Sequence, residues 1–571
     1  MFYKKKFTKI IAFLAFLLIL FSFNVVKAQT STHITFNVSE GFDLNGRSQI
    51  DAVLVKTKQN IYFYIEEDWW SSQSFQSQND TLSSLDNLSD EFNTNIYPVL
   101  TSIFGSEWKP GVDGDNKIAV FFHSMKPGIG GYFNSADEYL KLQIPKSNER
   151  EMVYISTEHL NSFNRLKILL SHEFTHLIEF NQKERISGSQ EEVWLNEAIA
   201  DYAVTVLGYD DKYFGSNLEK RVKDFLEKPT DSLTEWQETK YDYAINSAFF
   251  HYLVDHYGIN ILSDSLESKL AGIESINEAL LKNGYEEDFG EIYTNWTIAT
   301  VLNNCSLDIK YCYLNKNLTN LRISPTLNFL PLSGNSSLSV TNVIKNWSAN
   351  WQKIIGGNGD LKLEFESSPG LIFSIPYIII DDNNGHAVNF LVLDQNGRGS
   401  IDLKNFGAQY SSITIIPSLQ TKTSGFNGFE FTYPYTIKAT ISGIVSEEEK
   451  VTIQKLLEQI DLLKKQLADL QLKINSQGSS SGSCTISSNL YFGIKNSQVN
   501  CLQQFLVKEG GNIYPEGLIT GYFGSLTRSA VIRFQEKYKS EILLPFGLSS
   551  GTGFVGSSTR QKINQLILNG Q

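Results

Sequence analysis

The stretch Ser171-His-Glu-Phe-Thr-His-Leu-Ile-Glu-Phe180 lies in an apolar run that contains neither glycine nor proline and begins near Arg165, and this pattern predicts a helix. Residues four apart lie on one face of a helix, with Cβ atoms about 5–6 Å apart. His172 and His176 can therefore bind one Zn²⁺ ion, which takes histidine nitrogen at about 2.0–2.1 Å and prefers four ligands. Glu173 follows the first histidine, so its carboxylate lies beside the ion and can accept a proton from water.

A second helix downstream offers a third ligand. Ser189 and Glu192 have the S-x-x-E spacing of a capping box, which predicts the start of a helix that carries W-L-N-E-A-I-A-D-Y-A. Glu197 follows His176 after 20 intervening residues, which leaves room for a loop and one helical turn. Asp201 lies four residues further on the same face, where it can accept the outer N–H of a ligand histidine.

The combination of H-E-F-T-H and W-L-N-E-A-I-A-D-Y-A resembles the gluzincin metallopeptidases, the group of thermolysin and the zinc aminopeptidases, and is most similar to the hyicolysin type of secreted bacterial endopeptidase. The resemblance implies a thermolysin-like catalytic domain in which His172, His176 and Glu197 hold one Zn²⁺ ion. It implies that Glu173 is the general base and that Asp201 contacts a ligand histidine rather than the ion. H-E-x-x-H alone occurs by chance in many helices, so W-L-N-E and the aspartate four residues later carry much of the resemblance.

The peptidase resemblance also suggests a donor for the oxyanion of the tetrahedral intermediate. The stretch Y-A-I-N-S-A-F-F-H-Y-L, which begins at Tyr243, resembles the aminopeptidase sequence Y-x-x-G-x-x-x-x-x-x-L, whose tyrosine is that donor. Tyr243 is therefore the first candidate, although Asn246 replaces the glycine. Tyr241, His251 and His256 compete with it, and a packing role for Tyr243 is the alternative.

The strand expected at Met152–Ser156 comes shortly before the histidine helix. In thermolysin-like enzymes a strand in this region pairs with extended substrate, and such pairing holds a peptide largely regardless of its sequence. The G-x-M-E-N signature of zinc aminopeptidases, whose glutamate holds the free amine of the substrate, is absent, and Gly130-Gly-Tyr-Phe133 occupies a similar place without it. The resemblance therefore favours an endopeptidase.

The first residues predict export. Four lysines within positions 4–9 precede the 14-residue apolar run Ile10–Phe23, and Val26-Lys-Ala28 provides small residues for cleavage, so residues 1–28 are a predicted signal peptide. An uncleaved anchor is the alternative, although a membrane span takes about 20 residues. Removal of residues 1–28 deletes five lysines and no acid, which changes the net charge from −13 to −18. This acidity argues against nucleic acid as a partner and fits a secreted protein.

The whole chain has 571 residues, enough for several domains, and predicts a multidomain α+β architecture. Strand patterns come first, helix formers follow, and short apolar runs between Gly, Asn and Asp turns then predict a β-sandwich. The expected segments are a strand-rich peptidase lobe at 29–160, an α-helical zinc-binding lobe at 161–328, a β-sandwich at 330–443, a coiled coil at 446–475, a Ser/Gly linker at 476–483 and a small helical domain at 484–571.

Four cysteines form two sequence-local pairs, Cys305 with Cys312 and Cys484 with Cys501. Two disulfides suit an exported protein, and buried free thiols are the alternative. No C-x-x-C motif is present, which disfavours a cysteine zinc site.

The segment 446–475 carries an apolar seam of about three heptads, which predicts a short coiled coil and a homodimer through this segment. A monomeric amphipathic stalk is the alternative. The seam consists of Ile453, Leu456, Ile460, Leu463, Leu467, Leu470 and Ile474.

The last segment resembles the peptidoglycan-binding domain of bacterial wall hydrolases. The core of that pattern is G-x-F-G-x-x-T-x-x-A-V-x-x-F-Q, here Gly521–Gln535. The resemblance implies peptidoglycan or another cell-wall component as a partner. A second glycine pattern at 551–556 matches G-x-G-x-x-G, but no strand of a βαβ unit precedes it, so it is interpreted as a loop.

These motifs predict a secreted zinc endopeptidase that hydrolyses protein or peptide bonds and is tethered to the cell wall. A non-enzymatic wall-associated adhesin or scaffold and a peptidase acting on peptidoglycan stem peptides are the alternatives. Asp113-Gly-Asp115 is a candidate for a structural Ca²⁺ site, but position 124 is serine rather than the glutamate of an EF-hand loop. A turn is therefore the preferred interpretation there.

Overall fold

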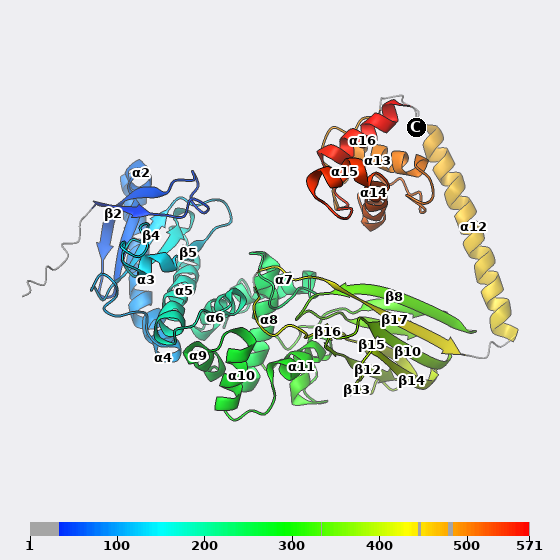
Figure 1. Cartoon of the computed structure of the whole chain (residues 1–571), viewed down its shortest axis with the longest axis horizontal. Coiled ribbons are helices and arrows are strands. Elements are labelled where there is room, and N and C mark those ends of the chain that lie inside the picture. The colour runs from blue at the N-terminus through cyan, green and yellow to red at the C-terminus, as the bar shows by residue number, and fades with distance from the viewer. Residues whose placement is uncertain (1–32, 333, 427, 443–446, 478–483, 570–571) are drawn as a thin grey trace, which may run out of the picture. The chain divides into compact units, whose positions relative to one another are not determined.

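The computed structural model describes residues 33–332, 334–426, 428–442, 447–477 and 484–569, and it divides into one compact unit up to Lys450 and another from Val451 onwards (Figure 1). The predicted signal peptide, residues 1–28, lies outside the described residues. Within the described part of the chain, no helix is long and apolar enough to cross a membrane.

The first unit begins with a six-stranded sheet in the order β1-β2-β3-β4-β6-β5. The strands are β1 (His33–Asn37), β2 (Gln49–Thr57), β3 (Ile61–Glu66), β4 (Ile118–His123), β5 (Gly131–Phe133) and β6 (Met152–Ser156). β3, β4 and β6 are parallel and buried throughout. Their near-continuous apolar sequences fit this burial, because both faces of the sheet are covered.

Alternate residues of these strands belong to two different cores. Ile61, Phe63 and Ile65 pack into the core shared with the helices, whereas Tyr62 and Tyr64 face an aromatic cluster on the other side of the sheet. The covering helices before β4 are α2 (Glu67–Ser72), α3 (Phe75–Glu91) and α4 (Tyr97–Phe104), with the π-helical turn Phe92–Ile96 between the last two.

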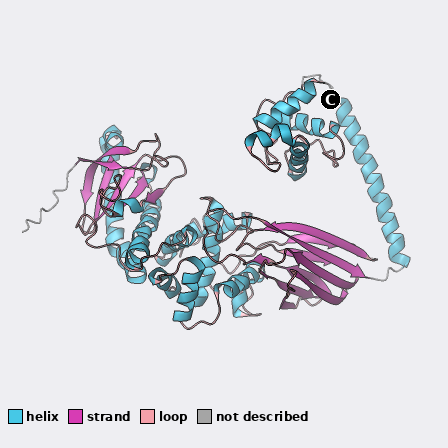
Figure 2. Ribbon diagram, viewed as in Figure 1, coloured by secondary structure: helices cyan, strands magenta, loops and turns pink. Residues whose placement is uncertain are grey.

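A helical lobe follows the sheet (Figure 2). Its helices are α5 (Phe163–Glu179), α6 (Val193–Val206), α7 (Asn217–Glu227), α8 (Lys240–Tyr257), α9 (Asn260–Glu267), α10 (Gly272–Lys282) and α11 (Phe289–Leu302), with the π-helical segment Phe180–Ile186 after α5. The apolar face of α5 is buried, which fixes the direction in which its histidines point. The structure pairs Cys305 with Cys312 in a disulfide, as predicted.

The start of α6 differs from the prediction. The helix begins at Val193, and neither its N-cap Glu192 nor Ser189 makes the expected capping-box contacts. Glu192 instead accepts the backbone N–H groups of Gly425 and Phe426 at 2.7 and 3.2 Å. Its carboxylate ties a loop of the following sheet region to the helical lobe, a contact that sequence spacing does not reveal.

The predicted strand-rich segment after the helices forms nine strands of one sheet and a separate pair. The strands are β7 (Thr326–Leu330), β8 (Ser336–Ile344), β9 (Gln352–Gly356), β10 (Gly359–Ser367), β11 (Phe373–Ser374), β12 (Pro376–Asp381), β13 (His386–Phe390), β14 (Arg398–Phe406), β15 (Tyr410–Ile415), β16 (Ser418–Leu419) and β17 (Tyr433–Ser442). The β14–β15 connection is a single pair, Phe406 with Tyr410. The strands that follow β14 in the sheet (β10, β17 and β8) and those that follow β15 (β12 and β13) share one apolar core, as layered sheets do.

The second unit contains the long helix α12 (Glu447–Gln477) from Val451 onwards and a small helical domain. Five described members of the predicted seam, between Leu456 and Leu470, are 45–62% exposed. The side chains of Ile453 and Ile474, and Ser446 before the helix, lie outside the description. The homodimer therefore stays a prediction, and the seam offers an apolar surface for it.

The small domain packs α13 (Ser497–Lys508), α14 (Ser525–Lys537), α15 (Lys539–Ile542) and α16 (Ser557–Leu568) around one apolar core, and a disulfide joins Cys484 to Cys501. It contains an internal repeat. Gln503 and Gln535, 32 residues apart, accept the N–H groups of Gly521 and Gly553, both at 2.9 Å. Their amides donate to the next carbonyl and to a threonine hydroxyl in each copy. The glycine pattern at 551–556 is a loop, as predicted, and it also belongs to a second copy of the T-G-x-x-G-S-x-T-R motif.

Candidate metal and active site

The two helices α5 and α6 bring the predicted ligands to one point. The Nε2 atoms of His172 and His176 lie 3.3 Å apart. Glu197 places Oε2 3.3 Å from Nε2 of His172 and Oε1 3.9 Å from Nε2 of His176. Two atoms bound to one tetrahedral zinc ion lie about 3.3 Å apart, given bond lengths of about 2.0–2.1 Å. The spacing of the three side chains therefore fits a zinc ion.

The chemistry of these atoms fits the ion as well. Glu197 Oε2 is buried and accepts no hydrogen bond of acceptable geometry among the described residues. A buried carboxylate oxygen without a partner is costly, and a cation removes that cost. Burial alone would raise the pKa of Glu197, but the neighbouring histidines outweigh burial and hold the pKa below its usual value. In the described part of the chain, His172, Glu173 and His176 form one group whose potential ligand atoms all lie within 4.8 Å of one another, and Glu197 is not a member of that group.

The side chain of Glu173, on α5, packs against the edge strand β5. This side chain is buried, and burial raises the pKa of its carboxyl above the usual value. A Cβ atom added to Gly131 of β5 would lie 2.9 Å from Glu173 Oε1 and 2.6 Å from the carbonyl oxygen of Tyr154. Gly131 thus lets the strand approach the carboxylate closely, and this packing fixes the position of the predicted base.

The carboxylate that contacts the outer nitrogen of a ligand histidine is Glu179. Its Oε2 lies 2.6 Å from Nδ1 of His176, a contact that orients the ring and directs Nε2 to the ligand cluster. The described hydrogen bonds of Asp201 go to other partners. Arg221 donates to it at 2.7 and 3.2 Å, and Asn217 donates at 3.1 Å. A bond from Asp201 to a histidine stays a prediction, and the structure adds Glu179 to the site.

Tyr243 lies on α8 and borders the same pocket as His172, Glu173 and Glu197. Its ring centroid is 6.4 Å from that of His172, and the guanidinium of Arg221 stacks over the ring at 4.4 Å. Burial raises the pKa of its hydroxyl, which keeps it protonated and able to donate. The competing residues are placed elsewhere: Tyr241 bonds to Glu227, His251 bonds to the carbonyl of Ser247, and His256 contacts the carbonyl of Cys312. The role of Tyr243 as oxyanion donor stays a prediction.

The pocket has a volume of about 420 Å³ and extends along the edge strand β5. Residues 128–133, Trp236 and Glu238 line it together with the candidate ligands. β6, the strand expected to pair with substrate, has β4 on one side and β5 on the other. That expectation is therefore wrong, because both edges of β6 are already hydrogen-bonded. β5 ends the sheet and offers its own edge to the pocket.

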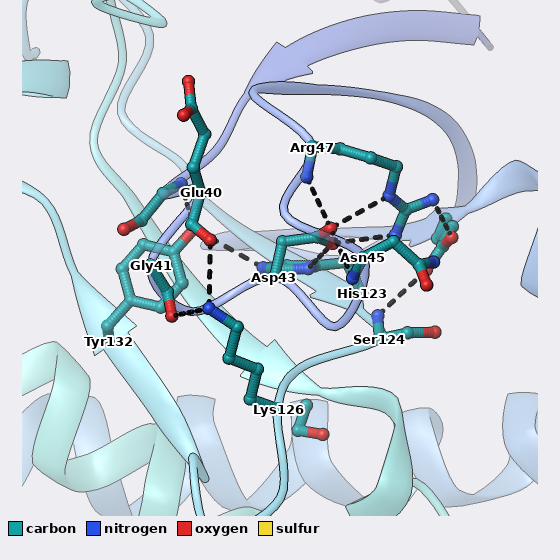
Figure 3. A network of polar contacts seen from close by, with 12 residues as sticks. Glu40, Gly41, Asp43, Asn45, Arg47, His123, Ser124, Lys126 and Tyr132 are labelled. Carbon is teal, nitrogen blue, oxygen red and sulfur yellow. Dashed lines mark hydrogen bonds and ion pairs between the residues drawn. The ribbon is translucent and has the colours of Figure 1, made fainter.

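A largely buried network of polar side chains contacts Tyr132 of β5 (Figure 3). Arg47, in the loop between β1 and β2, donates to Asp43 at 2.8 Å and to Glu66 at 2.5 Å. Asp43 Oδ1 lies 3.5 Å from Nδ1 of His123, whose Nε2 lies 3.4 Å from the hydroxyl of Tyr132. Tyr132 is the central residue of β5, so this network links the strand that borders the pocket to the interior of the lobe.

Two functional neighbours were missed in the sequence for different reasons. Glu179 stands three positions after His176, so H-x-x-E was a readable local signal for a carboxylate on the same helix face. Arg221 lies on α7, and only folding brings it to Asp201 and Tyr243. No local pattern indicates that contact.

In the acidic turn Asp113–Asp115 before β4, both aspartate side chains accept hydrogen bonds from groups of the protein. Asp113 Oδ1 accepts the N–H of Asp115 at 2.8 Å, and Asp115 Oδ2 accepts the hydroxyl of Tyr62 at 2.7 Å. The first of these contacts is that of an Asx turn. Calcium binding at this turn stays a prediction.

Comparison with protein families finds one match. Residues 495–542 match the family model described as a putative peptidoglycan binding domain. The match covers α13 to α15 and confirms the C-terminal part of the resemblance seen in the sequence. No curated protein matches the chain.

Several solved structures are similar to about a fifth of the chain. A periplasmic inhibitor of g-type lysozyme from Aeromonas hydrophila is 10% identical, with 21% of this chain and 100% of the inhibitor covered and a TM-score of 0.15. The Yersinia pseudotuberculosis-derived mitogen is 13% identical, with 20% and 92% covered and a TM-score of 0.14. The pre-peptidase C-terminal domain of a Bacillus anthracis collagenase is 7% identical, with 20% and 96% covered and a TM-score of 0.14. Scores this low carry no argument about the whole chain, and a thermolysin-like fold stays a prediction.

Proposed function

We propose that the chain is an exported zinc-dependent endopeptidase held at the cell wall by its C-terminal domain. The convergence of His172, His176 and Glu197 in the lining of one pocket carries the proposal, because the two Nε2 atoms lie 3.3 Å apart and the two carboxylate oxygens of Glu197 lie 3.3 Å from the first and 3.9 Å from the second. A non-catalytic scaffold has no need for this spacing of two imidazoles and a carboxylate.

The residues around the ligands have separable tasks in peptide hydrolysis. The chemistry that zinc supplies when bound is polarisation of a carbonyl group and activation of water. Glu173, packed against β5, takes the proton from water and later passes it to the leaving amine. Tyr243 donates its hydroxyl to the oxygen that gains negative charge. Glu179 keeps the ring of His176 in its orientation.

The edge of β5 supports an endopeptidase over an exopeptidase. An extended peptide can add to a sheet edge through backbone hydrogen bonds, and all three residues of β5 line the pocket together with Glu173. Backbone pairing places no requirement on a free terminus. We therefore infer internal cleavage of unfolded or extended segments.

The C-terminal match supports association with the cell wall. Tyr491 and Phe554 are 51% and 42% exposed, and their rings stack with centroids 6.3 Å apart. Exposed aromatic faces provide a flat apolar platform of the kind on which sugar rings stack. Binding of the full-length protein to purified sacculi should weaken when both residues are changed to alanine. Phe546→Ala, which removes another exposed ring, is the matched control.

Hydrolysis of casein by the full-length protein tests the enzymatic proposal. A chelator should abolish cleavage and added Zn²⁺ should restore it. Glu173→Gln should retain zinc and the folded state but lose nearly all turnover, because the amide cannot accept the proton. Glu158→Gln, which changes an exposed glutamate shortly before α5, should remain active. Full activity of Glu173→Gln, or no cleavage by zinc-loaded wild-type protein, would contradict the proposal.

Peptidoglycan stem peptides are a second candidate substrate. The observation that favours them is the wall-binding type of domain in the same chain. Assay of soluble murein peptides beside casein separates the two substrates, since a peptidase specialised for stem peptides would leave casein intact.

A further inference from the structure

A second cavity, of about 260 Å³, adjoins the candidate catalytic pocket. Gly130, Gly131, His172, Glu173 and Tyr243 line both spaces, so a ligand in the first pocket can extend directly into the second. The new part of its wall comes from the first half of α5, from α6 and α7, and from Lys240 at the start of α8. Its lining is strongly charged, which the proposed hydrolysis does not itself require.

The guanidinium of Arg165 lies near the N-terminal end of the edge strand β5. Arg165 lies seven residues, about two helical turns, before His172 on α5, and therefore faces the same side of the helix. A Cβ atom added to Gly130, the residue directly before β5, would lie 3.3 Å from Nη2 of Arg165. The guanidinium thus lies beside the backbone at which a peptide paired with β5 would leave the catalytic pocket.

Two of the cations in this cavity already have partners. Arg221 forms two hydrogen bonds to Asp201, and Lys240 pairs with Asp224 and Glu227. These contacts use the carboxylates that would otherwise neutralise the wall.

Two cations remain. Among the described residues, no carboxylate oxygen lies within 4.0 Å of the side-chain nitrogens of Arg165 or Lys220. The remaining acids on the wall are Glu173, which packs on β5, and Glu238, an exposed residue. Partial desolvation, followed by the positive charge of Arg221, lowers the pKa of both Arg165 and Lys220, and the opposite effect of Asp201 on both pKa values is smaller.

We propose that this second cavity is an anion subsite in which Arg165 and Lys220 bind a carboxylate of the peptide substrate. The inference rests on the proposed peptidase function and narrows its substrate class to peptides that present a carboxylate beyond the cleaved bond. A guanidinium can hold a carboxylate through two parallel hydrogen bonds, and an ammonium adds a third charged donor. The carboxylate is either an acidic side chain or the C-terminus of a short peptide, because both present the same group.

Binding to the catalytically silent Glu173→Gln full-length protein tests the inference without relying on turnover. The probes are labelled extended peptides with one Glu moved along an otherwise neutral scaffold, each compared with its Gln counterpart. A second arm compares a free C-terminus with an amidated one. We expect one Glu position, or the free terminus, to bind on the order of tenfold tighter than its neutral counterpart. The preference should decline with added salt.

Variants of Arg165 and Lys220 test whether these two residues cause the preference for a carboxylate. Arg165→Met and Lys220→Met, each made in the Glu173→Gln background, should reduce the Glu-to-Gln affinity ratio toward one. Lys223→Met is the matched control, since Lys223 is an exposed lysine of the same helix α7 that pairs with Glu219. It should leave the ratio unchanged. Circular dichroism establishes that each variant is folded, and Lys220, an exposed residue, provides the test if Arg165→Met does not fold.

The possible outcomes separate the two claims. Peptides that bind equally well with Glu and Gln at every position and with either terminus would overturn the subsite and leave the peptidase proposal intact. A preference that persists in both Met variants would overturn the assignment to Arg165 and Lys220. Failure of every peptide to bind zinc-loaded protein, together with intact casein, would overturn the proposed function and the subsite with it.

Discussion

Replacement of Gly131 by alanine tests whether the close contact between β5 and Glu173 positions the base. The added Cβ would lie 2.6 Å from the carbonyl oxygen of Tyr154 and 2.9 Å from Glu173 Oε1. Carbon and carbonyl oxygen normally approach to about 3.3–3.6 Å, so the strand and its neighbours must separate by about 0.7–1 Å. The backbone of Gly131 is not in the left-handed region, so the effect of the substitution is steric.

The expected cost has two parts. Overpacking of this kind destabilises a protein by about 1–3 kcal/mol, which lowers the urea midpoint of unfolding. A displacement of about 1 Å at a reacting group can reduce a rate on the order of 100-fold. We therefore expect Gly131→Ala to retain bound zinc, lose modest stability and lose most of kcat/KM, because the ligands lie on α5 and α6 whereas the contact lies at β5.

Three measurements check this expectation on the same preparation: zinc content, urea unfolding and peptide hydrolysis. Gly41→Ala is the matched control, because its added Cβ would meet nothing closer than 3.6 Å and its backbone also lies outside the left-handed region. Gly41→Ala should behave like the wild type. Wild-type stability and activity in Gly131→Ala would refute the reasoning that strand packing fixes Glu173.

Three further predictions follow from other contacts. Glu179→Gln should weaken zinc binding about 10–100-fold in a chelator competition, since the amide orients the ring of His176 less strongly than the carboxylate does; unchanged affinity would assign Glu179 no part in the site. Burial raises the pKa of Asp137 from 3.8 to about 6. The protonated carboxyl therefore stabilises the folded state below about pH 4, and this stabilisation is lost as pH rises through 6. The total loss in the free energy of unfolding is about 3 kcal/mol. Asp137→Asn should flatten that part of the pH dependence of urea unfolding, and an unaltered slope would contradict the assignment. Leu463→Lys should convert a dimer to a monomer in light scattering if α12 forms the predicted coiled coil, whereas a wild-type protein that is already monomeric would support the single-stalk alternative.

Local rules were enough for several parts of the molecule. The four-residue spacing of His172 and His176 is a property of any helix, so their convergence did not depend on the rest of the fold. The strand at 152–156 lies where the sequence predicted it. The glycine and threonine motif of the C-terminal domain likewise indicates the family of that domain, because its residues are close together in the chain.

Contacts between distant segments were not accessible in this way. The role of Glu192 depends on a loop more than 200 residues away, and the expected capping box was wrong because that tertiary contact uses the carboxylate. The expectation for β6 was wrong because strand order is set by which faces and edges pack, and one sequence pattern is compatible with a central or an edge position.

The sequence by itself determined the types of the candidate ligands, the helix that carries two of them and the family of the C-terminal domain. Only the tertiary structure decided that Glu197 reaches the same point, that β5 rather than β6 borders the pocket, and that Asp201 holds Arg221. The physical reason is range: helical spacing acts over one or two turns, whereas the position of a side chain relative to a distant strand follows from the burial of apolar faces throughout the lobe.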